Sequence, residues 1–295
     1  MTIAVSRAFS KIGVMLEMIK FEHTIFALPF ALTSMMLAAN GMPKLSVLGW
    51  ILLAMVGARS SAMAFNRIAD LRLDKLNPRT AKRALPKGIL TVAEVWAFTV
   101  VAAGLFVFAA WSLNPLAFAL SPVALVVIMG YSYTKRYTNL SHLVLGLALG
   151  IAPVGAWIAV TGRLEIAPMI LSAAVIFWTA GFDIIYALQD LDFDKRMGLY
   201  SIPKTLGPAK GLLISRAFHA LTAALLVAFG VFLHLGIAYY VGVGFAGVLL
   251  FYEQSLVKPN DFSKADVAFF NLNGFVSIGF FLFALIDLIA RHTLT

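Results

Sequence analysis

The sequence predicts an all-α membrane protein, a single domain over residues 1–295 whose helices cross the bilayer nine times. Two observations, composition and the length of the apolar runs, predict this class. Of the 295 residues, 61% are hydrophobic and 13% are charged, whereas a soluble domain has about 25% charged residues. The apolar residues gather in runs of about 20, the length that a helix needs to cross a hydrocarbon core of about 30 Å. The chain has no cysteine, which excludes disulfides and thiolate chemistry.

Nine apolar runs have the length of transmembrane helices, and most are joined by short polar connections. They cover residues 23–41, 46–66, 93–112, 115–132, 141–161, 166–189, 212–233, 236–254 and 267–290. Two connections are long and polar, residues 67–92 and 190–211. Because four spans, an even number, lie between these two connections, both long segments are expected on the same side of the membrane.

The 23 lysine and arginine residues are divided unevenly between the two sides of these spans. With a cytoplasmic N-terminus, only Lys44, Arg163 and Arg291 fall on the opposite side. Basic residues concentrate in the cytoplasmic loops of membrane proteins. We therefore expect a multi-pass protein of the inner (plasma) membrane with both long segments in the cytoplasm. The net charge of +9 then reflects topology and not nucleic-acid binding.

Two polar motifs follow the second and sixth spans. They share a four-residue spacing and lie 120 residues apart: Asn66, Asp70 and Asp74, and Tyr186, Asp190 and Asp194. Steps of four keep side chains on one helical face, where stacked carboxylates repel each other by a few tenths of a kcal/mol. An acid pair at a helix end is usually only a solvated terminus. Two matched motifs on one membrane face instead favour a bound cation, and oxygen ligands suit Mg²⁺ or Mn²⁺ better than zinc.

Basic residues lie near both motifs and complete the pattern. They are Arg79, Arg83, Lys87, Lys135, Arg136 and Lys204. In proteins, Mg²⁺ is usually held by one or two carboxylates together with the phosphate oxygens of a substrate. The pattern therefore predicts a diphosphate site, in which the acids bind metal and the basic residues bind the remaining negative charge.

The motifs resemble those of a known family. NRIADLRLD with NPRTAKRALP, and DIIYALQDLDFD with KRMGLYSIPKTLG, are similar to the two signature motifs of the UbiA superfamily of membrane prenyltransferases. YSYTKRYTNLSHLVLG resembles a connection in its 4-hydroxybenzoate polyprenyltransferase branch. The resemblance covers essentially the whole chain. It implies two related halves in a nine-helix bundle around a central cavity, capped by the two long segments.

The resemblance also implies an activity: transfer of a polyprenyl group from an allylic polyprenyl diphosphate to an aromatic acid, such as 4-hydroxybenzoate, in ubiquinone or menaquinone biosynthesis. It implies two Mg²⁺ ions, for which Mn²⁺ can substitute. The expected metal ligands are Asn66, Asp70, Asp74, Asp190 and Asp194. The expected substrate-binding residues are Arg59, Asn66, Arg79, Arg83, Tyr131, Lys135, Arg136, Tyr186 and Lys204.

Two charged residues lie deeper in the predicted spans. Asp183, seven residues before Asp190, is expected to assist substrate binding or proton removal. Arg59, seven residues before Asn66, is a costly residue at that depth and normally faces a polar interior or a partner. It either clamps the carboxylate of the aromatic substrate or forms a structural pair with an acid such as Asp183. Tyr131 is a weaker candidate for the same pocket.

One residue departs from the family pattern. Arg67 stands where the ubiquinone enzymes carry an acid. Together with IKFEHTIFALPFAL near the N-terminus, it resembles a subgroup of menaquinone synthesis by the futalosine route, so a naphthoate acceptor is an alternative, as are a chlorophyll-type acceptor and haem. A secondary transporter is an alternative of another class. Transporters bind substrate near the midplane, whereas these acids gather at one face, which favours an enzyme.

Overall fold

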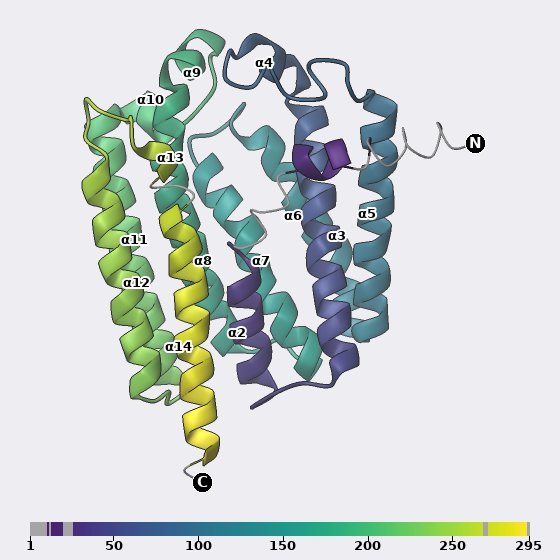
Figure 1. The fold of residues 1–295 in the computed structure, drawn as a ribbon, viewed down its shortest axis with the longest axis vertical. Helices are drawn as coiled ribbons and strands as arrows, with labels where there is room; N and C mark the ends of the chain where they lie inside the picture. The colour runs from purple at the N-terminus through teal and green to yellow at the C-terminus, as the bar shows by residue number, and fades with distance from the viewer. Residues whose placement is uncertain (1–10, 12, 20–25, 268–270, 294–295) are drawn as a thin grey trace.

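The computed structural model describes residues 11, 13–19, 26–267 and 271–293. Within this part, eight helices are long and apolar enough to cross a membrane, and they run side by side along the long axis of the molecule (Figure 1). They are α3 (Leu45–Ala69), α5 (Val92–Leu113), α6 (Pro115–Thr134), α7 (Ser141–Thr161), α8 (Ile166–Ala187), α11 (Pro208–Phe232), α12 (Ile237–Leu256) and α14 (Asn273–Thr293). The expected all-α membrane architecture is confirmed.

A ninth apolar helix, α2 (Leu28–Ala38), is shorter than the others. It has 11 residues, which at 1.5 Å per residue gives about 16 Å, roughly half of a hydrocarbon core. The span expected at 23–41 begins in residues 20–25, which lie outside the described part of the chain. The described helix α2 therefore covers the middle of the first span expected from the sequence.

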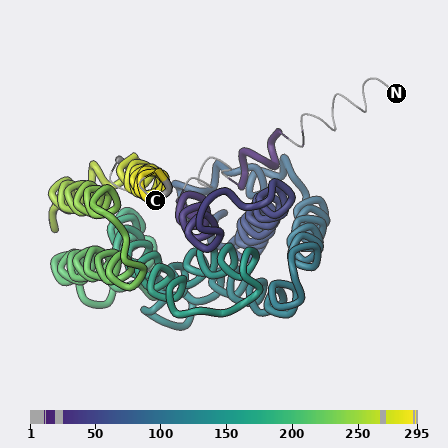
Figure 2. Tube along the Cα trace, turned by 90° about the horizontal axis from the view of Figure 1, so that it is seen from below, coloured from purple at the N-terminus to yellow at the C-terminus, as the bar shows by residue number. Residues whose placement is uncertain are grey.

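Figure 2 shows the same helices from below, nearly end-on. Sequence neighbours pack together in α5 with α6, α7 with α8, and α11 with α12. Two contacts join distant parts of the chain: α2 packs against α7, and α14 packs against α2. The last helix thus meets the first apolar helix.

Both long polar segments lie at the same end of the bundle, at the top of Figure 1. They are not simple loops, because they contain the short helices α4 (Leu71–Leu76), α9 (Leu191–Met197) and α10 (Ile202–Leu206). Gly198 ends α9 with a φ of 69°, a left-handed conformation that suits glycine. Thr91 and Glu94 form a capping box that starts α5. These local signals give the cap its shape.

Helices α7 and α8 pack closely beneath this cap. A Cβ at Gly146 would lie 2.3 Å from the backbone oxygen of Ile176, so only glycine allows this approach. Small residues serve the same purpose in other membrane helix pairs, where packing replaces the hydrophobic effect. On the other side of α8, Trp178 packs against Phe30 of α2 with ring centroids 5.0 Å apart. Helix α8 is therefore held from two sides.

Candidate active site

The two acidic motifs break their helices in the same way. Asp70 ends α3 with φ −91° and ψ 3°, and Asp190 precedes α9 with φ −100° and ψ 8°. This bridge region is sparsely populated and is common at active sites. Each motif therefore continues in a separate short helix, and the expected single helical face is interrupted after its second residue. The matched break supports the repeat that the 120-residue spacing indicated.

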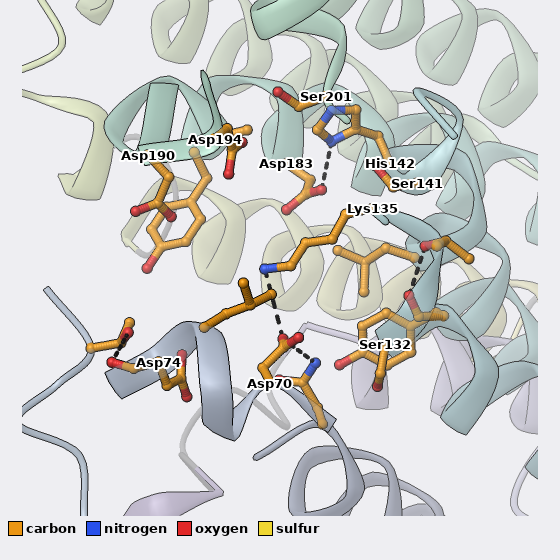
Figure 3. Close-up of a pocket in the computed structure, with 18 of the residues that line it drawn as sticks. Asp70, Asp74, Ser132, Lys135, Ser141, His142, Asp183, Asp190, Asp194 and Ser201 are labelled. Atoms are coloured by element: carbon orange, nitrogen blue, oxygen red, sulfur yellow. Dashed lines mark hydrogen bonds and ion pairs between the residues drawn. The ribbon is translucent and has the colours of Figure 1, made fainter. Parts of the chain in front are cut away.

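Both motifs nevertheless line one polar pocket, a cavity of about 290 Å³ beneath the cap. Figure 3 shows Asp70 and Asp74 on one side, Asp190 and Asp194 on the other, and Lys135 between them. Other expected site residues that line it are Arg59, Asn66, Arg79, Arg83, Tyr131, Asp183 and Tyr186. The backbone breaks aim the two motifs toward each other across the cavity.

Two of the expected substrate-binding residues do not line this pocket. Arg136 contacts Asp70 from outside the pocket lining. Its Nη2 lies 2.8 Å from Asp70 Oδ1 and 2.7 Å from the carbonyl oxygen of Ala69. Lys204 places its Nζ 5.0 Å from the ring centroid of Tyr200. Arg136 thus supports the first motif, and Lys204 lies at the edge of the cap.

The acids of the first motif are buried against positive charge. Asp70 and Asp74 are each 6% exposed. Asp70 Oδ2 lies 3.7 Å from Lys135 Nζ and accepts a hydrogen bond of 3.1 Å from Asn66 Nδ2. Both oxygens of Asp74 lie within 2.9 Å of Arg83 Nη1. A buried carboxylate is costly unless it is paired and hydrogen-bonded, and both acids meet that condition.

A contact across the cap joins the two motifs. Arg79, from the first long segment, forms a bidentate ion pair with Asp190 and donates from Nη1 to the Tyr186 hydroxyl at 2.7 Å. Asn77 Nδ2 donates to Asp190 Oδ1 at 3.0 Å. Burial acts to lower the pKa of Arg79, but the hydrogen bond to Asp190 and the nearby Tyr186 and Asp190 charges outweigh it and raise the pKa above its ordinary value.

Metal binding by these acids needs a further ligand. Within the described residues, no three His, Asp or Glu side chains are arranged to hold a metal ion by themselves. Lysine and arginine side chains instead pair with Asp70, Asp74 and Asp190. This donor set fits a magnesium ion that shares its coordination with substrate phosphates. When a diphosphate is present, the lysine and arginine side chains can bind its phosphate oxygens in place of the aspartates.

An apolar cavity of about 520 Å³ adjoins the polar pocket. Arg59 and Tyr131 line both, and they mark the boundary between them. Its walls include many small side chains, such as Ala58, Ala62 and Gly155. Its volume falls in the range of small-molecule sites, roughly 300–1,000 Å³. An elongated apolar group attached to a charged head fits the combined shape.

Among the pocket residues that were not predicted as site residues, three make polar contacts of note. His142 contacts Asp183, with Nδ1 2.7 Å from Oδ2. Asn77 contacts Asp190. Arg67, which the sequence marked only as a departure from the family pattern, lines the pocket. Its Nε donates a hydrogen bond of 3.2 Å to the carbonyl oxygen of Met18. A polar residue before a proline, as at Asn77, and a lone histidine beginning an apolar run were the available signals.

A bundle of membrane-length helices with a charged, capped pocket over an apolar cavity defines an enzyme embedded in the bilayer. Residues 27–277 match the UbiA prenyltransferase family. The chain belongs to this family, and the expected membership is confirmed.

Curated relatives cover most of the chain. A 4-hydroxybenzoate octaprenyltransferase of Vibrio parahaemolyticus is 34% identical over 241 residues, which are 81% of this chain and 84% of the relative. A 4-hydroxybenzoate solanesyltransferase of Synechocystis is 35% identical over 256 residues, 86% of each chain.

Solved structures share the fold. The apo structure of a UbiA homolog from Aeropyrum pernix has a TM-score of 0.79 at 34% identity, covering 92% of this chain and 98% of that chain. A UbiA homolog from Archaeoglobus fulgidus bound to DMAPP and Mg²⁺ has a TM-score of 0.72 at 20% identity, covering 93% and 99%.

Proposed function

We propose that the protein transfers a polyprenyl group from an allylic polyprenyl diphosphate to an aromatic acid such as 4-hydroxybenzoate, in the biosynthesis of ubiquinone or menaquinone. The observation that carries the proposal is the joining of two cavities: a polar one lined by both acidic motifs and an apolar one beneath it. The names of the curated relatives support the same reaction.

The diphosphate head lies between the two motifs in this proposal. Asn66, Asp70 and Asp74 bind one Mg²⁺, and Asp190 and Asp194 bind a second. The ions, for which Mn²⁺ can substitute, supply positive charge that screens the acids from the diphosphate. The Mg²⁺-bound homolog of Archaeoglobus fulgidus supports this requirement.

The basic side chains act on the leaving group. Arg79, Arg83 and Lys135 line the pocket. When the substrate is bound, these three side chains break their ion pairs with the aspartates and bind phosphate oxygens instead. Their charge stabilises the diphosphate as the bond between carbon and oxygen breaks. The aromatic rings of Tyr131 and Phe182 also line the pocket, and their π-faces stabilise the allylic cation that remains.

The aromatic acid then attacks this cation. Arg59 at the boundary between the cavities is placed to clamp the substrate carboxylate with its planar fork of donors. A structural pair with Asp183 is the competing role. Asp183 also lines the pocket, where it is available to bind substrate or to accept the proton released by the ring.

A product assay tests the function and its acceptor. Purified protein receives Mg²⁺, an octaprenyl diphosphate and equal amounts of 4-hydroxybenzoate and dihydroxynaphthoate, and mass spectrometry identifies the products. Prenylated 4-hydroxybenzoate is the expected main product. A prenylated naphthoate alone would assign the futalosine route, and no prenylated product from a folded, Mg²⁺-supplied protein would refute aromatic prenyl transfer.

The proposed setting is the inner membrane with the cap in the cytoplasm. The bias of lysine and arginine toward residues 67–92 and 190–211 supports this orientation. Both acidic motifs would then receive Mg²⁺ from the cytoplasm and release diphosphate to it, while the apolar cavity lies at membrane depth.

A further inference from the structure

A buried histidine links the floor of the pocket to the cap. His142 is the second residue of α7 and is 2% exposed. Its Nδ1 lies 2.7 Å from Asp183 Oδ2 in α8, and its Nε2 lies 3.3 Å from the backbone nitrogen of Ile202 in α10. Both ring nitrogens therefore have partners from different elements.

These two contacts determine which nitrogen carries the proton. The backbone N–H of Ile202 can only donate, so Nε2 of His142 must accept. The ring proton therefore lies on Nδ1, which donates to Asp183 Oδ2. The imidazole thus presents a fixed donor to the carboxylate. In histidines generally, the hydrogen bond at one ring nitrogen determines whether the other nitrogen is protonated.

Ile202 is well placed to fix this tautomer. It is the first residue of α10, after the N-cap Ser201, and the first N–H groups of a helix have no partner within it. His142 supplies an acceptor for one of them. The arrangement of the second cap segment is thereby coupled to the donor that faces Asp183.

Asp183 is held from one side and open on the other. Its side chain is 22% exposed, against 3% for His142, and it lines the polar pocket. Figure 3 shows the carboxylate between His142 and the open centre of the pocket, near Lys135. Oδ2 accepts from the imidazole, and Oδ1 is the oxygen left to meet a substrate.

We infer that His142 is a positioning residue that holds Asp183 as the acceptor of the proton leaving the aromatic ring. This inference rests on the proposed function. The ring's π electrons form the new bond to the prenyl carbon, and diphosphate keeps the electron pair of the broken bond. The electron pair of the ring C–H bond then returns to the ring as its proton moves to Asp183 Oδ1. His142 takes no proton and does not touch the substrate.

A merely structural role for His142 predicts different kinetics. If the imidazole only caps α10, its loss lowers stability or activity without changing which step limits turnover. If it positions the proton acceptor, its loss slows deprotonation specifically. A substrate deuterated at the reacting ring carbon separates these cases, because only slow deprotonation gives a primary isotope effect.

The test compares turnover of protiated and deuterated 4-hydroxybenzoate at saturating diphosphate and Mg²⁺. The wild type should show an isotope effect near one. His142→Leu should lose roughly 10–100-fold in turnover, as orienting partners commonly do, and should show a clear primary effect. His142→Gln should recover most of the turnover, because an amide has a donor for Asp183 and an acceptor for Ile202 but does not act as a base.

Two further variants control for folding. Ile202→Pro keeps the His142 side chain but removes the N–H that fixes its tautomer, and the proline Cδ would push the imidazole away from its contact with Asp183. Proline is tolerated at a first helical position, and the extended Ser201 before it, at φ −149° and ψ 155°, is compatible with a following proline. It should also raise the isotope effect. His219→Leu changes another buried histidine, 4% exposed and outside the pocket, and should leave the isotope effect at one.

The outcomes separate this inference from the proposed function. Wild-type turnover with a normal isotope effect in folded His142→Leu and Ile202→Pro would overturn the role of His142 while leaving prenyl transfer intact. If His142→Leu is not recovered folded, Ile202→Pro decides alone. Failure of the wild type to prenylate any aromatic acid would instead refute the proposed function.

Discussion

Replacing Asp70 with asparagine separates the chemistry of the first motif from its structure. The carboxylate lies 2.8 Å from Arg136 Nη2 and 3.7 Å from Lys135 Nζ, and it is proposed to bind metal. Asp70→Asn keeps the shape and one acceptor oxygen but removes the negative charge. The change therefore acts on the electrostatics of the site and hardly alters its packing.

The expected loss of rate is large and the expected loss of stability is small. Removing one preorganised electrostatic contact commonly costs about 10²–10³ in rate, or about 2.7–4 kcal/mol in activation free energy. Arg136 keeps its hydrogen bonds to the carbonyl oxygens of Ala69 and Ser132, at 2.7 and 3.2 Å. Unfolding free energy should then fall by no more than about 2 kcal/mol.

The assay is initial-rate prenyl transfer with saturating Mg²⁺, alongside thermal unfolding in the same detergent. Asp192→Asn is the matched control, because Asp192 is exposed and does not line the pocket. It should retain wild-type rate and stability. A folded Asp70→Asn protein that works within tenfold of the wild type would refute the assignment of Asp70 to the metal and diphosphate.

Removing divalent ions with EDTA should abolish prenyl transfer, and Mg²⁺ or Mn²⁺ should restore it; full activity in thoroughly chelated membranes would contradict the metal proposal. The chain has no native cysteine, so Lys82→Cys should be labelled by reagents that reach the cytoplasm, and labelling only from outside the cell would reverse the orientation. Arg59→Leu should raise KM for the carboxylated acceptor with little change in KM for the diphosphate, and Arg59→Lys should recover only part of it. A destabilised Arg59→Leu protein that Asp183→Leu rescues would establish the structural pair instead. Arg83→Leu removes a partner of the buried Asp74, so it should lower the unfolding free energy by about 1–3 kcal/mol; Mg²⁺ with inorganic diphosphate should restore thermal stability, and an unchanged melting temperature in both conditions would argue against the buried pair.

The long spans were predictable because hydropathy alone determines them. The run at 166–189 became α8, Ile166–Ala187, and the run at 46–66 became α3, Leu45–Ala69. A bilayer requires each such run to satisfy its backbone within one helix. The polar ends of these runs are then visible in the sequence as clearly as their apolar middles.

The cap was less predictable, since its short helices have no hydrophobic signal. Helix α4 and helix α9 consist largely of charged and apolar residues in segments expected as loops. At the backbone break, Asp190 accepts hydrogen bonds from Asn77 and Arg79, more than 100 residues earlier in the chain. The acids that the four-residue spacing indicated line one pocket, but the spacing could not reveal that break.

The site residues divide in the same way. Matched spacing indicated Asp70, Asp74, Asp190 and Asp194, because repetition is visible in one sequence. His142 was missed because its importance arises from Asp183, 41 residues away, and from a backbone N–H in the cap. Neither partner can be identified from the neighbours of His142 in the sequence.

The contact between Asn77 and Asp190 also imposes an order on biosynthesis. The two residues are 113 positions apart, which at about 5–20 residues per second corresponds to roughly 6–23 s of translation. Four membrane helices, α5 to α8, must be made and inserted in that interval. Until then Asn77 and Arg79 of the first cap segment lack their Asp190 partner, whereas Arg83 already has Asp74 within the same segment. A chain that ends before Asp190 is therefore expected to carry a first cap segment that lacks this contact across the cap.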